Sequence, residues 1–216
     1  MTIQGTIYLS SDAYSYGNSY RKPGIVVKKH LQDGLSYHGE SYNITVSYDD
    51  GFDPQDYGCS KLACAWNKFR FNWCPGNSDN SSDFNLMLLN ENEVGGPIGG
   101  ATGPYPNDGC VAAVVRGANY ISRHDKRGNR TGDDSSGVES RIRAAVHEVG
   151  HNLGIDHNDG LKYEHYYPNY GAYEDRATPM GCPSGGSNHC GTNCVNNRDV
   201  WDHYYSDCGG SGIVRH

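Results

Sequence analysis

The residues best suited to chemistry lie together between positions 144 and 157, where three histidines and one glutamate are closely spaced. On a helix, His147 and His151 are one turn apart on the same face, so both imidazoles can reach one metal ion. Glu148 lies about 100° around the helix from His147, where it can approach an open coordination position without becoming a ligand. Gly154 can adopt the left-handed conformation that ends a helix, and this turn would bring His157 back as a third ligand.

Three neutral imidazoles favour a zinc ion that keeps its full positive charge and a fourth position for water. The pKa of that water falls to about 7, which gives a hydroxide-like nucleophile at neutral pH, and Glu148 is placed to act as its general base. A histidine pair at this spacing also occurs by chance on amphipathic helices. The added Gly154 and His157 favour a metal site over histidines that merely cap and solvate a helix end.

A second motif follows the histidines, at Thr178-Pro179-Met180-Gly181-Cys182-Pro183. Together with His-Glu-x-x-His-x-x-Gly-x-x-His it resembles the metzincin zinc metallopeptidases, with Met180 where that family has its Met-turn beneath the metal. The resemblance is to the whole clan, which includes the adamalysins, matrixins and astacins. Asn158-Asp159 matches no familiar subfamily marker, and Cys182 stands where astacins have a tyrosine that can approach the metal.

The resemblance implies a zinc-dependent endopeptidase that hydrolyses peptide bonds in proteins, with one catalytic zinc ion and Glu148 as general base. It also implies an α+β fold whose upper part is α/β-like. A twisted, mixed, mostly parallel sheet with an antiparallel edge strand would pack on two helices, and a smaller irregular C-terminal subdomain would contain one helix. Residues 1–157 would form the N-terminal subdomain, and residues 158–216, with the Met-turn and disulfides, would complete one catalytic domain.

A glycine-rich stretch from Pro97 to Gly103 is the expected edge strand, because a central strand would tolerate neither the proline nor so many glycines. The resemblance implies that an extended peptide or protein substrate pairs with this strand, at Ile98, Gly99, Gly100 and Ala101. A mobile glycine loop is the alternative interpretation of the same residues.

Two other functions stay open from the sequence: a secreted binding module that contains zinc, and a zinc hydrolase that acts on a non-protein amide. Glu148 favours an enzyme over the binding module, since a structural metal site has no use for a non-ligating carboxylate beside an open position. An edge strand that pairs with peptides would favour the endopeptidase.

The composition restricts the possible partners and the compartment. The net charge of -7 argues against nucleic acid as a partner, and no apolar run approaches the roughly 20 residues that span a bilayer. Eight cysteines without a Cys-x-x-Cys pair favour disulfides and a secreted, extracellular protein. They form two groups of four, one before and one after the histidine motif, and the sequence leaves their pairing open. Calcium is possible at the acidic loops Asp49–Gly51 and Asp133–Asp134, and a monomer is the default expectation.

The helix with the histidines must be held firmly if it is to position a metal. We expect it to begin at a capping box, Ser136–Glu139, and to bury an apolar face made of Val138, Ile142, Ala145, Val146, Val149 and Leu153. Alternation or apolar runs predict strands at 3–9, 42–48, 84–89 and 110–115. A helix is expected from Pro23 to Asp33-Gly34, an irregular disulfide-pinned insertion from Asp49 to Asp83, and a last helix from Asn196 to Cys208.

Overall fold

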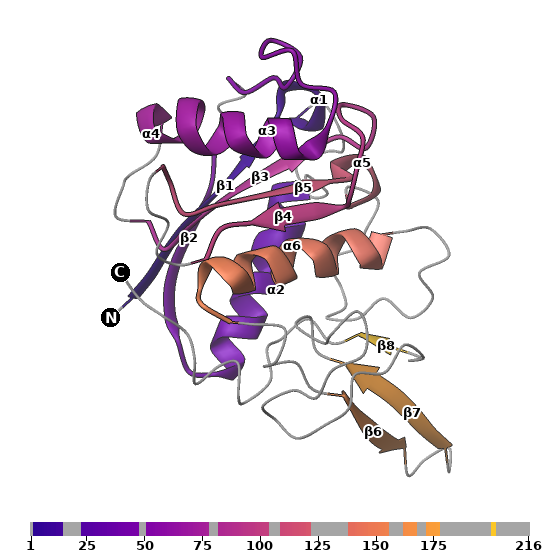
Figure 1. The fold of residues 1–216 in the computed structure, drawn as a ribbon. Helices are drawn as coiled ribbons and strands as arrows, with labels where there is room; N and C mark the ends of the chain where they lie inside the picture. Colours follow the sequence, from indigo (N-terminus) through magenta and orange to yellow (C-terminus); the bar gives the residue numbers. More distant parts are fainter. Residues whose placement is uncertain are drawn as a thin grey trace.

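The structure is a computed structural model, and it describes residues 2–14, 23–47, 51–77, 82–103, 109–121, 138–155, 162–167, 172–177 and 200–201. A five-stranded sheet in the order β2-β1-β3-β5-β4 forms its centre (Figure 1). Its strands are β1 (Thr2–Leu9), β2 (Ser41–Val46), β3 (Phe84–Leu89), β4 (Gly99–Ala101) and β5 (Ala112–Arg116). All neighbouring strands are parallel except β4 and β5, which are antiparallel. The predicted α+β fold, with a mostly parallel sheet and an antiparallel edge strand, is confirmed.

Two long helices, α2 (Pro23–Tyr37) and α6 (Val138–Asn152), pack on one face of this sheet (Figure 1). Short helices α1 (Ser11–Tyr14) and α5 (Ala118–Ile121) complete this layer. The core between helices and sheet is built from fully buried aliphatic side chains, among them Ile7, Leu86 and Val115. Central strand β3 is buried along its whole length, as expected for a parallel strand that is covered on both faces.

The opposite face is covered by α3 (Leu62–Lys68), a π-helical turn (Phe69–Trp73) and α4 (Cys74–Asn77). The expectation of an irregular insertion is therefore wrong for this part of the chain. Leu62, Ala65, Phe69 and Trp73 recur every three or four residues, and all are buried with the opposite face of the sheet. The polar residues between these positions obscure the helical period in the sequence.

Two disulfides fasten the insertion, one between Cys59 and Cys64 and one between Cys74 and Cys110. Both bridges pair cysteines within the first group of four, and the sequence alone did not fix this connectivity. The second bridge joins the first residue of α4 to the residues just before β5, and so ties the insertion to a central part of the sheet. The second group of four cysteines lies outside the described residues.

The first long helix runs further than the sequence predicts. Gly34 was expected to end it, but α2 continues to Tyr37, because Gly34 and Leu35 are buried on its sheet-facing side. The chain turns only at Gly39, which has a φ of 69°. Burial of the next apolar residue therefore outweighs the weak helix propensity of an interior glycine, which lowers stability by about 1 kcal/mol relative to alanine.

A second sheet lies nearer the C-terminus, with β6 (Lys162–Tyr167), β7 (Ala172–Ala177) and β8 (Val200–Trp201) in that order. Strands β6 and β7 form an antiparallel pair, and β8 runs parallel to β7. The predicted last helix, Asn196–Cys208, is wrong at Val200 and Trp201, which pair with Arg176 and Ala177 instead. Valine and tryptophan are strong strand formers, which explains the difference. The remainder of that predicted helix lies outside the described residues.

One acidic side chain is buried beside the carboxyl end of β1. Glu93 is 7% exposed, and its carboxylate accepts hydrogen bonds from the Ser10 hydroxyl, at 2.7 Å, and from the Asn90 backbone N–H. Burial raises the pKa of Glu93 to about 7, and the nearby charges of Asp12 and Asp53 act in the same direction.

In the described part of the chain, no helix is both long enough and apolar enough to cross a membrane.

Candidate active site

Helix α6 carries the predicted histidines, and its apolar face is packed firmly in the core. Ile142, Ala145, Val146, Val149 and Leu153 are fully buried against the sheet and α2, which confirms the predicted apolar face over these residues. The described helix begins at Val138, within the predicted capping box, and Ser136 lies outside the described residues. Figure 1 shows α6 passing directly beneath β4 and β5. Side chains on its remaining face are therefore held at a defined position relative to the sheet edge.

His147 and His151 lie side by side on α6, as their spacing predicts. Their ring centroids are 4.7 Å apart, and the ring planes stand at 86° to each other. The Nδ1 atom of His151 lies 3.0 Å from the carbonyl oxygen of Ile155. If Nδ1 carries the proton and donates it to that carbonyl, the lone pair is on Nε2, which is how protein structures commonly orient a metal-binding histidine. The two residues therefore fit a transition-metal site such as zinc.

The helix ends in the turn that Gly154 was expected to make. Gly154 has a φ of 84°, in the left-handed region that favours glycine. The N–H of Ile155 donates to the Gly150 carbonyl at 2.9 Å, and the N–H of Gly154 donates to the His151 carbonyl at 3.1 Å. This is the bond pattern of a Schellman-type helix end. Ile155 is 1% exposed, so the chain leaves the helix from an anchored position.

The third predicted ligand, His157, and Met180 of the predicted Met-turn lie outside the described residues. Among the residues that are described, no group of three or more histidine, cysteine, aspartate or glutamate side chains is arranged to hold a metal ion. The described residues thus supply the first two histidines of the predicted set. Asp133–Asp134, and Asp49 and Asp50 of the other predicted calcium loop, also lie outside them.

Glu148 lies against the edge strand. A Cβ atom placed on Gly99 would be 2.7 Å from both Cγ and Oε1 of Glu148, which is closer than real Cβ atoms approach. The glutamate side chain therefore occupies the space that any other residue at position 99 would fill. Burial raises the pKa of Glu148 to about 7. A carboxylate with this pKa exchanges protons readily near neutral pH, which suits a general base.

Within the described part of the chain, strand β4 lies at the edge of the five-stranded sheet and pairs with β5 alone. The register opposes Gly99 to Val115, Gly100 to Val114 and Ala101 to Ala113. Thr102 N–H donates to the Ala112 carbonyl and Arg116 N–H donates to the Ile98 carbonyl, at 2.9 and 2.8 Å.

Hydrogen-bonded pairs alternate along an antiparallel ladder. The backbone groups of Ile98, Gly100 and Thr102 consequently point toward β5, whereas those of Gly99 and Ala101 point outward. Of the four residues predicted to contact a substrate, Gly99 and Ala101 are therefore the two with outward-facing N–H and C=O groups.

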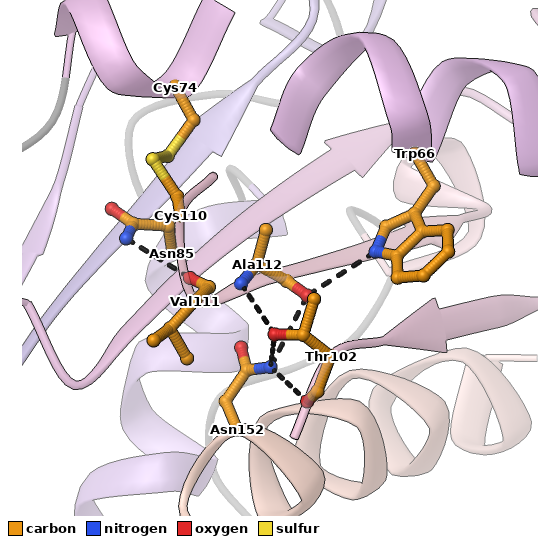
Figure 2. The surroundings of a disulfide bond; sticks show 8 residues. All are labelled: Trp66, Cys74, Asn85, Thr102, Cys110, Val111, Ala112 and Asn152. Atoms are coloured by element: carbon orange, nitrogen blue, oxygen red, sulfur yellow. Dashed lines mark hydrogen bonds between the residues drawn. A yellow bond between two sulfur atoms is a disulfide. The ribbon is translucent and has the colours of Figure 1, made fainter. Parts of the chain in front are cut away.

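Asn152 connects this edge strand to α6 (Figure 2) and was not identified from the sequence. It is fully buried, and its Nδ2 lies 2.9 Å from the Thr102 carbonyl oxygen, 3.3 Å from Thr102 Oγ1 and 3.3 Å from the Ala112 carbonyl oxygen. Thr102 Oγ1 also accepts a hydrogen bond from Ala112 N–H at 3.1 Å. One sequence signal could have revealed it, because Asn152 is a polar residue three positions after Val149 on the apolar side of the helix.

A partly buried ionic cluster fastens the other half of α6. Glu91 Oε1 accepts hydrogen bonds from Arg116 at 3.2 Å and from Arg141 at 3.0 Å. Arg116 also donates to the Val94 carbonyl at 2.6 Å, and the guanidinium of Arg141 lies over the Tyr120 ring. The cluster joins α6 to the end of β5 and to the connection before β4. These three charged residues were also missed by the sequence analysis.

Comparison with solved structures finds distant likenesses. No protein-family model matches the chain, and no curated protein matches it. A chain in a solved structure described as a chaperone-substrate complex has 17% identity and a TM-score of 0.46, and the match covers 99% of this chain and 34% of that one. Metalloproteinase-II from Bacteroides fragilis has 15% identity and a TM-score of 0.37, with 72% of this chain and 43% of that chain covered. The chain therefore spans about a third of the first of these proteins.

Proposed function

We propose that the chain is a zinc-dependent endopeptidase that hydrolyses peptide bonds in extended segments of proteins. The observation that carries the proposal is the contact between Glu148 and Gly99. It brings a carboxylate suited to general-base catalysis against a sheet edge where a peptide backbone can pair. The adjacent histidines, His147 and His151, lie side by side on one helix, and the contact between His151 Nδ1 and the Ile155 carbonyl supports a role as metal ligands.

His147 and His151, with His157 as the third ligand implied by the sequence motif, would hold the metal. When bound, zinc supplies positive charge that makes a water molecule more acidic and polarises a substrate carbonyl. Glu148 takes a proton from the attacking water and delivers it to the leaving amine. Met180 would form an apolar base beneath the metal, as in the proteins that the motif resembles.

The edge strand supports a peptide as the substrate rather than a small amide. Gly99 and Ala101 direct their N–H and C=O groups outward, so a substrate in extended conformation can add as a further strand. The Glu148 carboxylate lies against Gly99, and a backbone that pairs there passes close to it. Binding and proton transfer would thus occur at the same residue of the strand.

The disulfides support an extracellular location for this activity. Cys59–Cys64 and Cys74–Cys110 form and persist in oxidising compartments, and they are rare in the cytosol. We therefore include secretion in the proposed function.

The test compares wild type with Glu148→Gln and Glu148→Asp for cleavage of unfolded casein, with zinc content measured for each protein. Wild type is expected to bind about one zinc ion and to cleave. Glu148→Gln should keep its zinc and lose activity by a factor of about 10² to 10⁴, the usual contribution of a general base. Glu148→Asp should retain part of the activity, because it keeps a carboxylate at a shorter reach.

Different failures would have different meanings. If wild type binds zinc and cleaves no protein, a binding module or a hydrolase for non-protein amides explains the site better. A folded wild-type protein that takes up no zinc would refute the metal site itself.

A further inference from the structure

We propose that Asn152 is a positioning residue that holds the edge strand β4 in a fixed position relative to Glu148. An extended substrate that pairs with β4 is then placed beside the general base. The inference rests on the proposed endopeptidase function. It concerns a side chain at a variable position of the histidine motif, away from the outward edge of β4.

The first argument comes from where the Asn152 amide group is directed. Its Nδ2 donates to Thr102, the first residue after β4, and to Ala112, the first residue of β5. Thr102 and Ala112 also bind each other twice, through N–H to carbonyl at 2.9 Å and N–H to hydroxyl at 3.1 Å. One amide on the helix therefore fastens both strands where β4 leaves the sheet.

The second argument is that β4 depends on such a connection. It has three residues, two of them glycines, and one neighbouring strand among the residues that the structure describes. Glycine loses more backbone entropy than any other residue when it is ordered, so this strand has little stability of its own. At its start, the Ile98 carbonyl accepts a hydrogen bond from Arg116 N–H. At its end, Asn152 provides the matching restraint from the helix.

The third argument is that asparagine at this position has a cost. Position 152 is fully buried, and the described residues offer no donor to its Oδ1 atom. A buried acceptor without a partner lowers stability, and this cost offsets part of what the Nδ2 hydrogen bonds contribute. What asparagine adds is the Nδ2 donor, and every acceptor that this atom reaches belongs to the edge-strand junction.

The fourth argument is the position of Asn152 on the helix. It follows His151 directly and lies four residues after Glu148, one turn along α6. The helix thus carries the base and the strand's anchor on the same rigid segment, so a shift of the strand relative to this anchor is also a shift relative to Glu148. The geometry of the site therefore depends on the Asn152 hydrogen bonds.

The main test replaces Asn152 with leucine, which has a similar volume and no donor. We expect KM for an extended peptide substrate to rise about tenfold, the usual effect of losing one buried hydrogen bond, with a smaller change in kcat. Zinc content should be unchanged. A peptide hydroxamate inhibitor that pairs with β4 should bind about tenfold more weakly, while acetohydroxamate, which reaches only the metal, should bind as it does to wild type.

Thr102 offers an independent pair of variants. Thr102→Val removes the hydroxyl at constant shape and is expected to raise KM in the same direction as Asn152→Leu. Thr102→Ser restores the hydroxyl and should recover most of that loss. A readout without catalysis is hydrogen exchange at the Thr102 backbone N–H, which should become faster in Asn152→Leu because its partner strand is less firmly held.

Ile142→Val is the control for general destabilisation, because Ile142 is buried on α6 and belongs to the helix core rather than the strand junction. Equal changes in KM, peptide-hydroxamate affinity and Thr102 exchange in Asn152→Leu and Ile142→Val would overturn the proposal. So would an Asn152→Leu variant that binds the extended inhibitor as tightly as wild type. Failure of the proposed function is recognised separately, because wild type itself would then bind no zinc or cleave no peptide, and the inference would fall with it.

Discussion

Replacing Gly99 with alanine tests whether the Glu148 side chain needs the space that a Cβ atom at position 99 would fill. The new Cβ would lie 2.7 Å from Cγ and Oε1 of Glu148 and 3.0 Å from its Cδ. Ordinary carbon contacts are about 3.5–4.0 Å, so the groups must separate by about 1 Å. Gly99 is paired with Val115 in the sheet, whereas Glu148 is a side chain with several rotamers. We therefore expect the glutamate to move.

The expected effects on stability and activity differ in size. An off-rotamer glutamate costs about 0.5–1.5 kcal/mol, and replacing glycine by alanine in a strand returns about 0.5–1 kcal/mol. The free energy of unfolding should therefore change by less than about 1 kcal/mol. A displaced base loses much of its contribution to catalysis, and because a shift of about 1 Å can reduce the rate about 100-fold, we expect a fall in kcat of that order.

Gly100→Ala is the matched control on the same strand. Among the described residues, no atom lies within 4 Å of a Cβ placed on Gly100, and its backbone pairs with Val114. The variant should remain folded and keep kcat within about threefold of wild type, since the added methyl group does not touch Glu148.

The assay measures kcat and KM with a fluorogenic peptide, together with the melting temperature and zinc content of both variants. A Gly99→Ala protein with wild-type kcat and zinc content would refute the reasoning, because the carboxylate would then not need the space beside the strand. Equal losses in Gly99→Ala and Gly100→Ala would show that any added side chain on β4 blocks the substrate.

Two further predictions concern stability. The pKa of Glu93 is raised in the folded protein, so the folded state holds this proton more tightly than the unfolded state does. The contribution of Glu93 to stability is therefore greatest below the unfolded pKa of 4.5 and is lost as pH rises through about 7. Chemical denaturation of wild type and Glu93→Gln across this range should differ by up to about 3 kcal/mol, and identical pH profiles would contradict the burial argument. The two disulfides close loops of different length, with a sequence separation of 36 for Cys74–Cys110 and 5 for Cys59–Cys64. Replacing both cysteines by serine should therefore lower the free energy of unfolding by about 4 kcal/mol for the longer loop and by about 2 kcal/mol for the shorter one. Melting temperatures in the reverse order would contradict the loop-entropy reasoning.

The sequence predicts most of the main sheet because its strands have simple patterns. Ile3 and Ile7 alternate with polar residues in β1, and β3 is a continuous apolar run, so each pattern matches the burial that the strand has in the fold. The edge strand was predicted from its glycines and Pro97, and the strand itself is restricted to Gly99–Ala101. Its limits depend on the bonds to β5, which a local pattern does not contain.

The errors share a physical cause, which is tertiary packing that local signals do not report. Gly34 was expected to end α2, but burial of Leu35 extends the helix. The segment before β3 was considered irregular, although Phe69 and Trp73 pack on the sheet through a helical turn. Val200 forms a strand because β7 offers a partner.

The sequence predicts the residues of the candidate site that would carry the chemistry, but not the residues that position them. His147, Glu148 and His151 belong to a motif whose spacing is explained by one helix. Asn152 acts through Thr102, which is 50 residues away in the sequence, and no short motif can contain such a pair. Supporting contacts of this kind follow from the fold and become visible only when strands and helices are placed together.

Three locally unfavourable features meet at the junction of α6 and β4. The edge strand contains two glycines, which weaken a strand, and Glu148 is buried enough to raise its pKa to about 7. Asn152 buries an acceptor for which the described residues have no donor. Each of these features has a cost in stability when it is considered by itself. Such features concentrate where function requires them, and their meeting beside His147 and His151 is an argument for an active site that does not depend on the histidine motif.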